Sequence, residues 1–318
     1  MPQAALEGAA AAAQAGIPVV LVGDEAQLKP GLAQLGANVD VAHAPDHIRM
    51  EEQATDVRRR KESSIMVATA LVKSGEASAV VSMGHSGATM AAALLGLGRI
   101  RGVERPAIVA NVPTSRGVSA LLDVGANADN RPAHLQQFAV MGTAYAKAML
   151  GISNPTVGLM SIGEEEQKGN ELTREAHELL AGTPGINFHG NVEGRDVLKG
   201  TTDIIVTDGF TGNVILKLAE GEARELFRWI KDALTSSGPL VKVGAGLVRP
   251  ALKQVAAKLD PAEYGAQPLL GVRSNAFIGH GSSDARAVTS ALKTAARSVE
   301  QGLAERISRA LEEAAVEA

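Results

Sequence analysis

Glycine-rich polar segments recur along this chain, and their residue types suit the binding of an anion. They lie at residues 84–88, 123–127, 163–170, 208–213 and 279–284. Glycine lets main-chain N–H groups approach a ligand closely, and N–H groups at a helix start carry the positive end of the helix dipole. Segments 84–88, 208–213 and 279–284 fit this description best and predict phosphate binding. The Ser, Asp and Asn residues in them could also act only as helix N-caps.

Side chains that could perform other chemistry are few. Two of the seven histidines, His85 and His280, lie in these segments, and we expect the other five on the surface or in structural roles. The chain has no Cys, so a nucleophile must be oxygen or nitrogen or belong to the substrate. Residues 164–166 are three adjacent Glu, which cannot all face one point, and no His-Glu-x-x-His pair occurs, so no metal site is predicted.

Composition excludes further classes of protein. No Gly-x-Gly-x-x-Gly follows the first predicted strand and no Gly-Lys-Ser/Thr occurs, so no nucleotide cofactor is predicted. With 31 basic against 35 acidic side chains and only 3% aromatic residues, the chain lacks the features of a nucleic-acid binder. No apolar run is long enough to span a membrane, and we expect a cytoplasmic protein.

The elements around the glycine-rich segments follow one repeated order of strand, loop and helix. A short apolar run precedes each segment and a helix follows it, which predicts strands at residues 79–82, 118–122, 156–162, 203–207 and 276–278. This alternation predicts an α/β fold with a doubly wound, mostly parallel sheet covered by helices on both faces. Because strand-to-helix loops of a parallel sheet share one edge, we expect all five segments to converge on one crevice.

The alternation of predicted strands and helices ends after residue 213. Helices are predicted over residues 214–234 and 248–259, separated by a break at 235–239 and an apolar stretch at 240–249. We therefore expect one domain over residues 1–318 from which a helical hairpin, at about 214–260, projects. Apolar residues near cations at its tip suit either a dimer contact or shallow insertion into an anionic leaflet.

Assembled in order, these segments resemble the bacterial PlsX phosphate acyltransferase family. The matching motifs lie at residues 63–65, 81–88, 122–129, 162–172, 190–196, 208–213, 259–265 and 279–284. The resemblance implies a Rossmann-like fold similar to phosphotransacetylases and isocitrate dehydrogenases. It also implies transfer of a long-chain fatty acyl group from acyl carrier protein to inorganic phosphate, giving acyl phosphate for phospholipid synthesis without a cofactor. The resemblance further implies a homodimer in peripheral contact with the membrane or with a membrane acyltransferase.

In such a reaction phosphate is the nucleophile, and the protein must position it and stabilise the oxyanion. As catalytic donors we predict Lys168, Asn170, Asn127 and Asn213. As phosphate-binding residues we predict Gly84, His85, Ser86, Gly87, His280, Gly281 and Ser282, and as supporting residues Asp123, Glu165, Arg195 and Asp208.

Carrier protein is acidic, so its docking site should be basic. The predicted docking residues are Arg58, Arg59, Arg60, Lys61, Lys242, Arg249 and Lys253. The predicted membrane contact consists of Val243, Leu247 and Val248 in the apolar stretch of the hairpin.

Two departures from the family pattern leave alternatives open. His85 and Ser86 replace the usual Asn-Thr, which adds a titratable group. The chain also starts after the family's first strand and its Asp-Ala-Met-Gly-Gly-Asp loop, and we expect a misassigned start rather than a shortened form. The alternative functions are a phosphotransacetylase-like enzyme for small acyl groups on coenzyme A, and a non-catalytic, membrane-associated dimeric scaffold.

Overall fold

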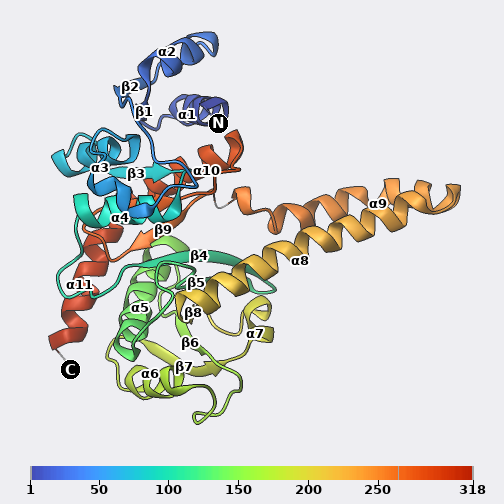
Figure 1. The fold of residues 1–318 in the computed structure, drawn as a ribbon. Coiled ribbons are helices and arrows are strands. Elements are labelled where there is room, and N and C mark those ends of the chain that lie inside the picture. Colours follow the sequence, from blue (N-terminus) through green and yellow to red (C-terminus); the bar gives the residue numbers. More distant parts are fainter. Residues whose placement is uncertain (1, 264, 317–318) are drawn as a thin grey trace.

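A computed structural model describes residues 2–263 and 265–316 (Figure 1). Tyr264, which lies within one of the family motifs, is therefore outside the described residues. The strands are β1 (Val20–Gly23), β2 (Asp40–His43), β3 (Ala79–Ser82), β4 (Ala107–Thr114), β5 (Gly117–Leu122), β6 (Thr156–Met160), β7 (Asn187–Val192), β8 (Ile204–Val206), β9 (Gln267–Leu270) and β10 (Asn275–Ile278).

Helices alternate with most of these strands. The α-helices are α1 (Pro2–Gln14), α2 (Glu25–Gln34), α3 (Ser64–Ser74), α4 (Ser86–Gly96), α5 (Pro132–Tyr145), α6 (Glu171–Ala181), α7 (Gly194–Lys199), α8 (Gly209–Ser236), α9 (Pro239–Lys258), α10 (Ala285–Glu300) and α11 (Leu303–Val316). The short helices are η1 (Ala54–Arg58), η2 (Ala146–Leu150) and η3 (Pro261–Glu263).

Within the described residues the central sheet has eight strands in the order β3-β10-β9-β4-β5-β8-β6-β7, and β1 and β2 form a separate parallel pair. Pairs β3–β10, β5–β8, β8–β6 and β6–β7 are parallel. Pairs β10–β9, β9–β4 and β4–β5 are antiparallel. The predicted α/β class with a mostly parallel sheet is confirmed.

The antiparallel pairs divide the sheet into two directions. Strands β3, β10 and β4 run one way, and β9, β5, β8, β6 and β7 run the other way. Segments 84–88 and 279–284 therefore leave the sheet at one end, and segments 123–127, 163–170 and 208–213 leave it at the opposite end. The prediction that all five share one edge is wrong, because it assumed a sheet without reversals. We call the end with segments 84–88 and 279–284 the histidine end, because it carries His85 and His280. We call the other end the lysine end, because it carries Lys168.

Apolar side chains from both faces of the sheet form two cores. Ala120 and Leu122 pack with α5, α6 and α11 on one face, whereas Leu121, between them, packs with α3, α4 and the start of α8 on the other. Successive side chains of a strand point to opposite faces, so a strand that is buried on both faces needs consecutive apolar residues. Helices therefore cover both faces of the sheet, as the sequence predicts.

Helices α8 and α9 form the predicted hairpin, which projects far from the sheet (Figure 1). Its turn is much shorter than predicted, because Gly238 is the N-cap and Pro239 the first residue of α9. The apolar stretch at residues 240–249 is thus not a loop at the tip but the first half of α9. No helix in the described part of the chain is long and apolar enough to cross a membrane.

Candidate active site

Four of the glycine-rich segments contain a side chain that caps the following helix. A cap of this kind occupies a main-chain N–H group that an anion would otherwise use. The capping residues His85, Asn170, Asp208 and Asp284 accept hydrogen bonds from the N–H groups of Ala88, Thr173, Thr211 and Ala287 at 3.2, 3.0, 2.9 and 2.8 Å. These four side chains therefore act as helix N-caps.

At the histidine end, His85 has both ring nitrogens engaged. Nδ1 accepts from Ala88 N–H, so the proton lies on Nε2, which donates to the Glu52 carbonyl oxygen at 3.1 Å. Gly87 packs close to Ala54 of η1, because a Cβ on Gly87 would lie 3.0 Å from that of Ala54. Gly84 and Ser86, by contrast, are exposed. His85 thus holds the segment before α4 in place rather than offering a donor to phosphate.

The neighbouring segment presents a second, differently arranged histidine. His280 is exposed, its Nδ1 accepts from Ser282 N–H at 3.2 Å, and the Ser282 hydroxyl lies 2.6 Å from the same nitrogen. The proton of a neutral His280 is therefore on Nε2, which has no partner among the described residues. The Nε2–H group of His280 therefore remains available to an anion, whereas the N–H and hydroxyl groups of Ser282 both contact Nδ1 of His280.

At the lysine end, Asp123 is fully buried and organises its segment. Oδ1 accepts from the N–H groups of Ile108, Gly125 and Ala126 at 3.0, 3.2 and 3.0 Å, and Oδ2 from Asn127 N and Nδ2 at 2.8 and 2.9 Å. Burial raises the pKa of the Asp123 carboxyl above its ordinary value, and these donors oppose the shift. A carboxylate with five donors is a structural anion rather than a general base.

Asn127 and the start of α8 are built around Asp123. The second Asn127 Nδ2 hydrogen bond goes to the Pro106 carbonyl oxygen at 2.7 Å, so the carboxamide has no donor left for a substrate. Gly209 N–H donates to the Asn127 carbonyl oxygen at 2.9 Å. A side chain at Gly212 would overlap the Asp123 carbonyl oxygen, so glycine is required there for close approach. Asn213, one residue later, is exposed.

Lys168 and Asn170 are also exposed at this end. Asn191 of β7 contacts the segment that carries them, because its Nδ2 donates to the Glu165 carbonyl oxygen at 2.8 Å. That bond orients the carboxamide, so its Oδ1 must accept from His177 Nδ1–H at 3.1 Å. The sequence signal for Asn191 was its place in the 190–196 motif, whereas nothing in the sequence pairs it with His177.

Other predicted residues are engaged in ion pairs. Arg195 contacts Glu164 at 3.3 Å and Glu193 at 2.9 Å. Arg60 pairs with Asp46 and, at 2.7 Å, with Glu52, which ties the segment before η1 together. The remaining predicted docking cations, Arg58, Arg59, Lys61, Lys242, Arg249 and Lys253, are exposed and outside these ion pairs.

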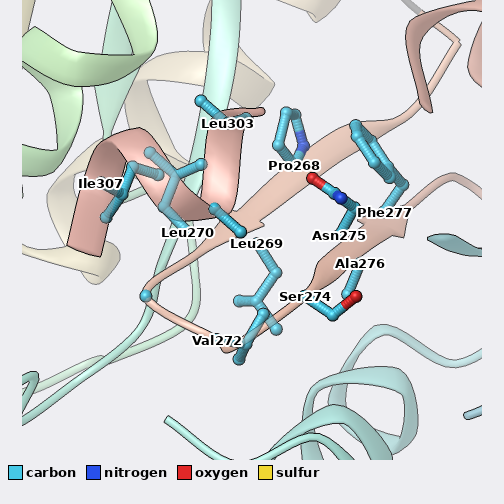
Figure 2. Close-up of a pocket in the computed structure, with 12 residues that line it drawn as sticks. Pro268, Leu269, Leu270, Val272, Ser274, Asn275, Ala276, Phe277, Leu303 and Ile307 are labelled. Carbon is cyan, nitrogen blue, oxygen red and sulfur yellow. The ribbon is translucent and has the colours of Figure 1, made fainter. Parts of the chain in front are cut away.

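A small pocket lies at the turn between β9 and β10, against α11 (Figure 2). Its lining includes Leu269, Val272, Phe277, Leu303 and Ile307 and no titratable side chain, and it has room for about one water molecule. It is at the opposite end of β10 from His280. Among the described residues no group of three His, Cys, Asp or Glu could hold a metal ion.

Comparison with known proteins decides the family. A family model described as "Fatty acid synthesis protein" matches residues 1–306. A phosphate acyltransferase from Thermus thermophilus is 62% identical over 310 residues, covering 98% of this chain and 94% of the relative. The chain belongs to this family. One from Pelotomaculum thermopropionicum is 51% identical, covering 98% of this chain and 92% of the relative. The predicted membership of the PlsX phosphate acyltransferases is thereby confirmed.

Solved structures with a similar fold are more distant in sequence. A phosphotransacetylase from Streptococcus pyogenes superposes with a TM-score of 0.62 at 17% identity, covering 94% of this chain and 91% of the other. A 4-hydroxythreonine-4-phosphate dehydrogenase from Klebsiella pneumoniae gives 0.57 at 13% identity, covering 94% of both chains. At these identities the likeness concerns the fold, and it agrees with the predicted Rossmann-like architecture.

Proposed function

We propose that this phosphate acyltransferase family member transfers a long-chain fatty acyl group from acyl carrier protein to inorganic phosphate. The observation that carries the proposal is the 62% identity to a phosphate acyltransferase over 98% of the chain. It agrees with the absence of Cys, because phosphate itself supplies the nucleophile. The product would be an acyl phosphate for phospholipid synthesis, and the reaction needs no cofactor.

The chemistry requires positioning more than activation. A phosphate oxygen attacks the thioester carbonyl carbon, the C–S bond breaks, and the carrier's thiolate leaves and takes up a proton. A substantial fraction of inorganic phosphate is dianionic at neutral pH, since its second pKa lies near neutrality. The protein must therefore hold phosphate close to the carbonyl and stabilise the oxyanion that forms.

Groups at the two ends of the sheet that were predicted from the sequence take these roles in our proposal. At the histidine end, phosphate is held by the exposed Nε2–H of His280 and by Gly84, Ser86, Gly281 and Ser282. At the lysine end, Lys168, Asn170 and Asn213 stabilise the oxyanion. His85, Gly87, Asp123, Asn127, Glu165, Asp208 and Arg195 support the segments that carry these donors.

Docking of the acidic carrier protein rests on the exposed cations. Arg58, Arg59 and Lys61 form one group, and Lys242, Arg249 and Lys253 lie on one side of α9 by helical periodicity. Arg60 is left out because its guanidinium is already paired. Replacing Arg58, Arg59 and Lys61 together by Glu should raise KM for acyl carrier protein more than KM for phosphate; equal changes would contradict this assignment.

The hairpin suits a peripheral membrane contact by a homodimer in the cytoplasm. Leu247 is 79% exposed and Val243 66%, and both lie in the first half of α9. Changing Leu247 and Val248 to Glu should abolish binding to anionic liposomes and leave the dimer intact. Unchanged liposome binding would refute the membrane contact.

Phosphate-dependent release of free carrier protein from palmitoyl carrier protein tests the reaction itself. The same assay with acetyl-coenzyme A distinguishes a phosphotransacetylase-like enzyme, which would prefer the short acyl group. Absence of turnover with both donors would overturn the proposed function and favour a non-catalytic scaffold.

A further inference from the structure

Five exposed arginines lie at the lysine end of the sheet, in segments to which the sequence assigned no role. They come from the turn between α4 and β4, from the residue before α5 and from the turn between β9 and β10 (Figure 2): Arg99, Arg101, Arg105, Arg131 and Arg273. Strand β4 starts beside the end of β5, because Val109 pairs with Leu122. Strand β9 ends beside the start of β4, because Leu270 pairs with Ala107. These segments therefore leave the sheet at the same end as Asp123.

Hydrogen bonds connect the three segments. Arg273 Nε donates to the Arg99 carbonyl oxygen at 2.9 Å, and Arg99 Nη1 donates to the Glu104 carbonyl oxygen. The Glu104 carboxylate forms an ion pair with Arg131. The five arginines thus come from separate parts of the chain but share one connected region, which we call the arginine surface.

The turn between α4 and β4 is anchored to α5 beneath it. Ile100 and Val103 are buried and pack in the same core as α5. The Gln137 carboxamide on α5 accepts from Glu104 N–H and donates to the Gly102 carbonyl oxygen, both at 2.9 Å. Because the backbone is fixed in this way, its exposed arginines lose less conformational entropy on binding a partner than cations on a mobile loop would lose.

The arginine surface has an excess of positive charge, although the formal net charge of the chain is -4. In the three segments that form it, the five arginines face two acidic residues, Glu104 and Asp129. Of the five, only Arg131 forms an ion pair within the described part of the chain. Guanidinium groups bind carboxylates in bidentate, charge-assisted pairs. The chemistry of the surface therefore selects an acidic partner.

The arginine surface adjoins the start of α8. Arg105 precedes Pro106, whose carbonyl oxygen accepts from Asn127 Nδ2 at 2.7 Å. The Asn127 carbonyl oxygen accepts from Gly209 N–H at 2.9 Å, and Asn213 lies one turn further along α8. Two hydrogen bonds thus connect the surface to the helix that carries one of the proposed oxyanion donors.

We propose that the arginine surface is a docking site for the acidic acyl carrier protein at the lysine end. This inference rests on the proposed function, which stabilises the thioester oxyanion at the same end. The docking cations predicted from the sequence lie elsewhere. Helix η1, which ends at Arg58, packs at the histidine end, since Ala54 lies close to Gly87, and the other group lies on α9. An oppositely charged surface beside the oxyanion donors speeds the encounter and orients the carrier.

Charge reversal at three of the arginines tests the docking site. Replacing Arg101, Arg105 and Arg273 together by Glu should raise KM for palmitoyl carrier protein about tenfold and weaken binding of holo carrier protein in parallel. KM for phosphate should stay within about twofold of the wild-type value. Replacing the same residues by Lys keeps the charge and should restore most of the affinity. Both effects should shrink at high ionic strength, because salt screens exposed charges.

The matched control is an equal charge reversal at the histidine end, with Arg58, Arg59 and Lys61 replaced by Glu. The inference requires the larger rise in KM for carrier protein from the variant at the lysine end. An equal or smaller rise overturns it, as does loss of binding to anionic liposomes with carrier binding unchanged. If the triple variant does not fold, Arg101→Glu alone, at a side chain without a hydrogen bond among the described residues, should still raise KM about twofold.

Direct binding separates this inference from the proposed function. If wild-type protein binds holo carrier protein through these arginines but shows no phosphate-dependent turnover, the proposed function falls and the docking site stands. If turnover is normal and KM for carrier protein is unchanged in the Glu variant, the docking site alone is refuted.

Discussion

Replacing Asp123 by Asn should destabilise the protein far more than an ordinary Asp-to-Asn change. The buried carboxylate accepts three N–H groups on Oδ1, from Ile108, Gly125 and Ala126, and two on Oδ2, both from Asn127. Asn offers one oxygen and one NH2 group. In its better orientation the oxygen takes the place of Oδ1, and the NH2 group faces two donors that lose their acceptor.

Each buried donor left without an acceptor costs about 1 to 3 kcal/mol, so the free energy of unfolding should fall by about 2 to 6 kcal/mol. The matched control is Asp208→Asn, because Asn caps a helix as well as Asp does; it should cost less than about 1 kcal/mol. Urea unfolding followed by circular dichroism measures both. Equal losses for the two variants would refute the view that the Asp123 carboxylate organises the lysine end.

Three other substitutions test neighbouring parts of the structure. Gly212→Ala should cost about 3 kcal/mol because its Cβ would overlap the Asp123 backbone, whereas Gly221→Ala, with open space around it, should be neutral or stabilising; urea unfolding of the pair checks this. His177→Phe removes the donor that orients Asn191 beneath the Lys168 segment and should lower kcat/KM about tenfold. Thr183→Val loses the partly buried hydrogen bond that the Thr183 hydroxyl accepts from Gln136 and should lower stability alone; equal kinetic losses for the two variants would contradict the role of His177 in orienting Asn191. Burial lowers the pKa of His134, although Glu104 opposes the shift, so the folded state favours neutral histidine and stability should decline as pH falls below about 6.5; thermal melts of His134→Gln should show a weaker decline.

Much of the fold could be predicted from local patterns. Strands β3, β5 and β10 fall within a residue of their predicted bounds, because apolar runs followed by glycine-rich turns mark both where a strand ends and where a helix begins. The predicted β6 was too long, since Ser161 turns to donate its hydroxyl to the Lys168 carbonyl oxygen. The early start of α9 was missed although Gly238 and Pro239 mark it, because the apolar run after them suits a loop at a tip as well as a helix.

The candidate site was only half predictable. His280, Lys168 and Asn170, which residue type and position marked as candidate donors, are exposed in segments that follow strands of the sheet. Residue type could not show that Asn127 has both amide donors engaged or that His85 has both ring nitrogens engaged, since these partners lie 21 and 33 residues away in the chain.

By itself the sequence determined the family, the α/β class and the residue types available for phosphate chemistry, because ordered motifs and alternating patterns are local properties of the chain. Only the tertiary structure decided which of those residues can act together. Three antiparallel pairings reverse half of the sheet and send His280 and Lys168 to opposite ends. Two of them, β4–β5 and β9–β10, are hairpins between consecutive strands, and the third places β4 beside β9, which is far away in the chain. Strand direction depends on which strands become neighbours, and the order of elements along the chain does not specify that.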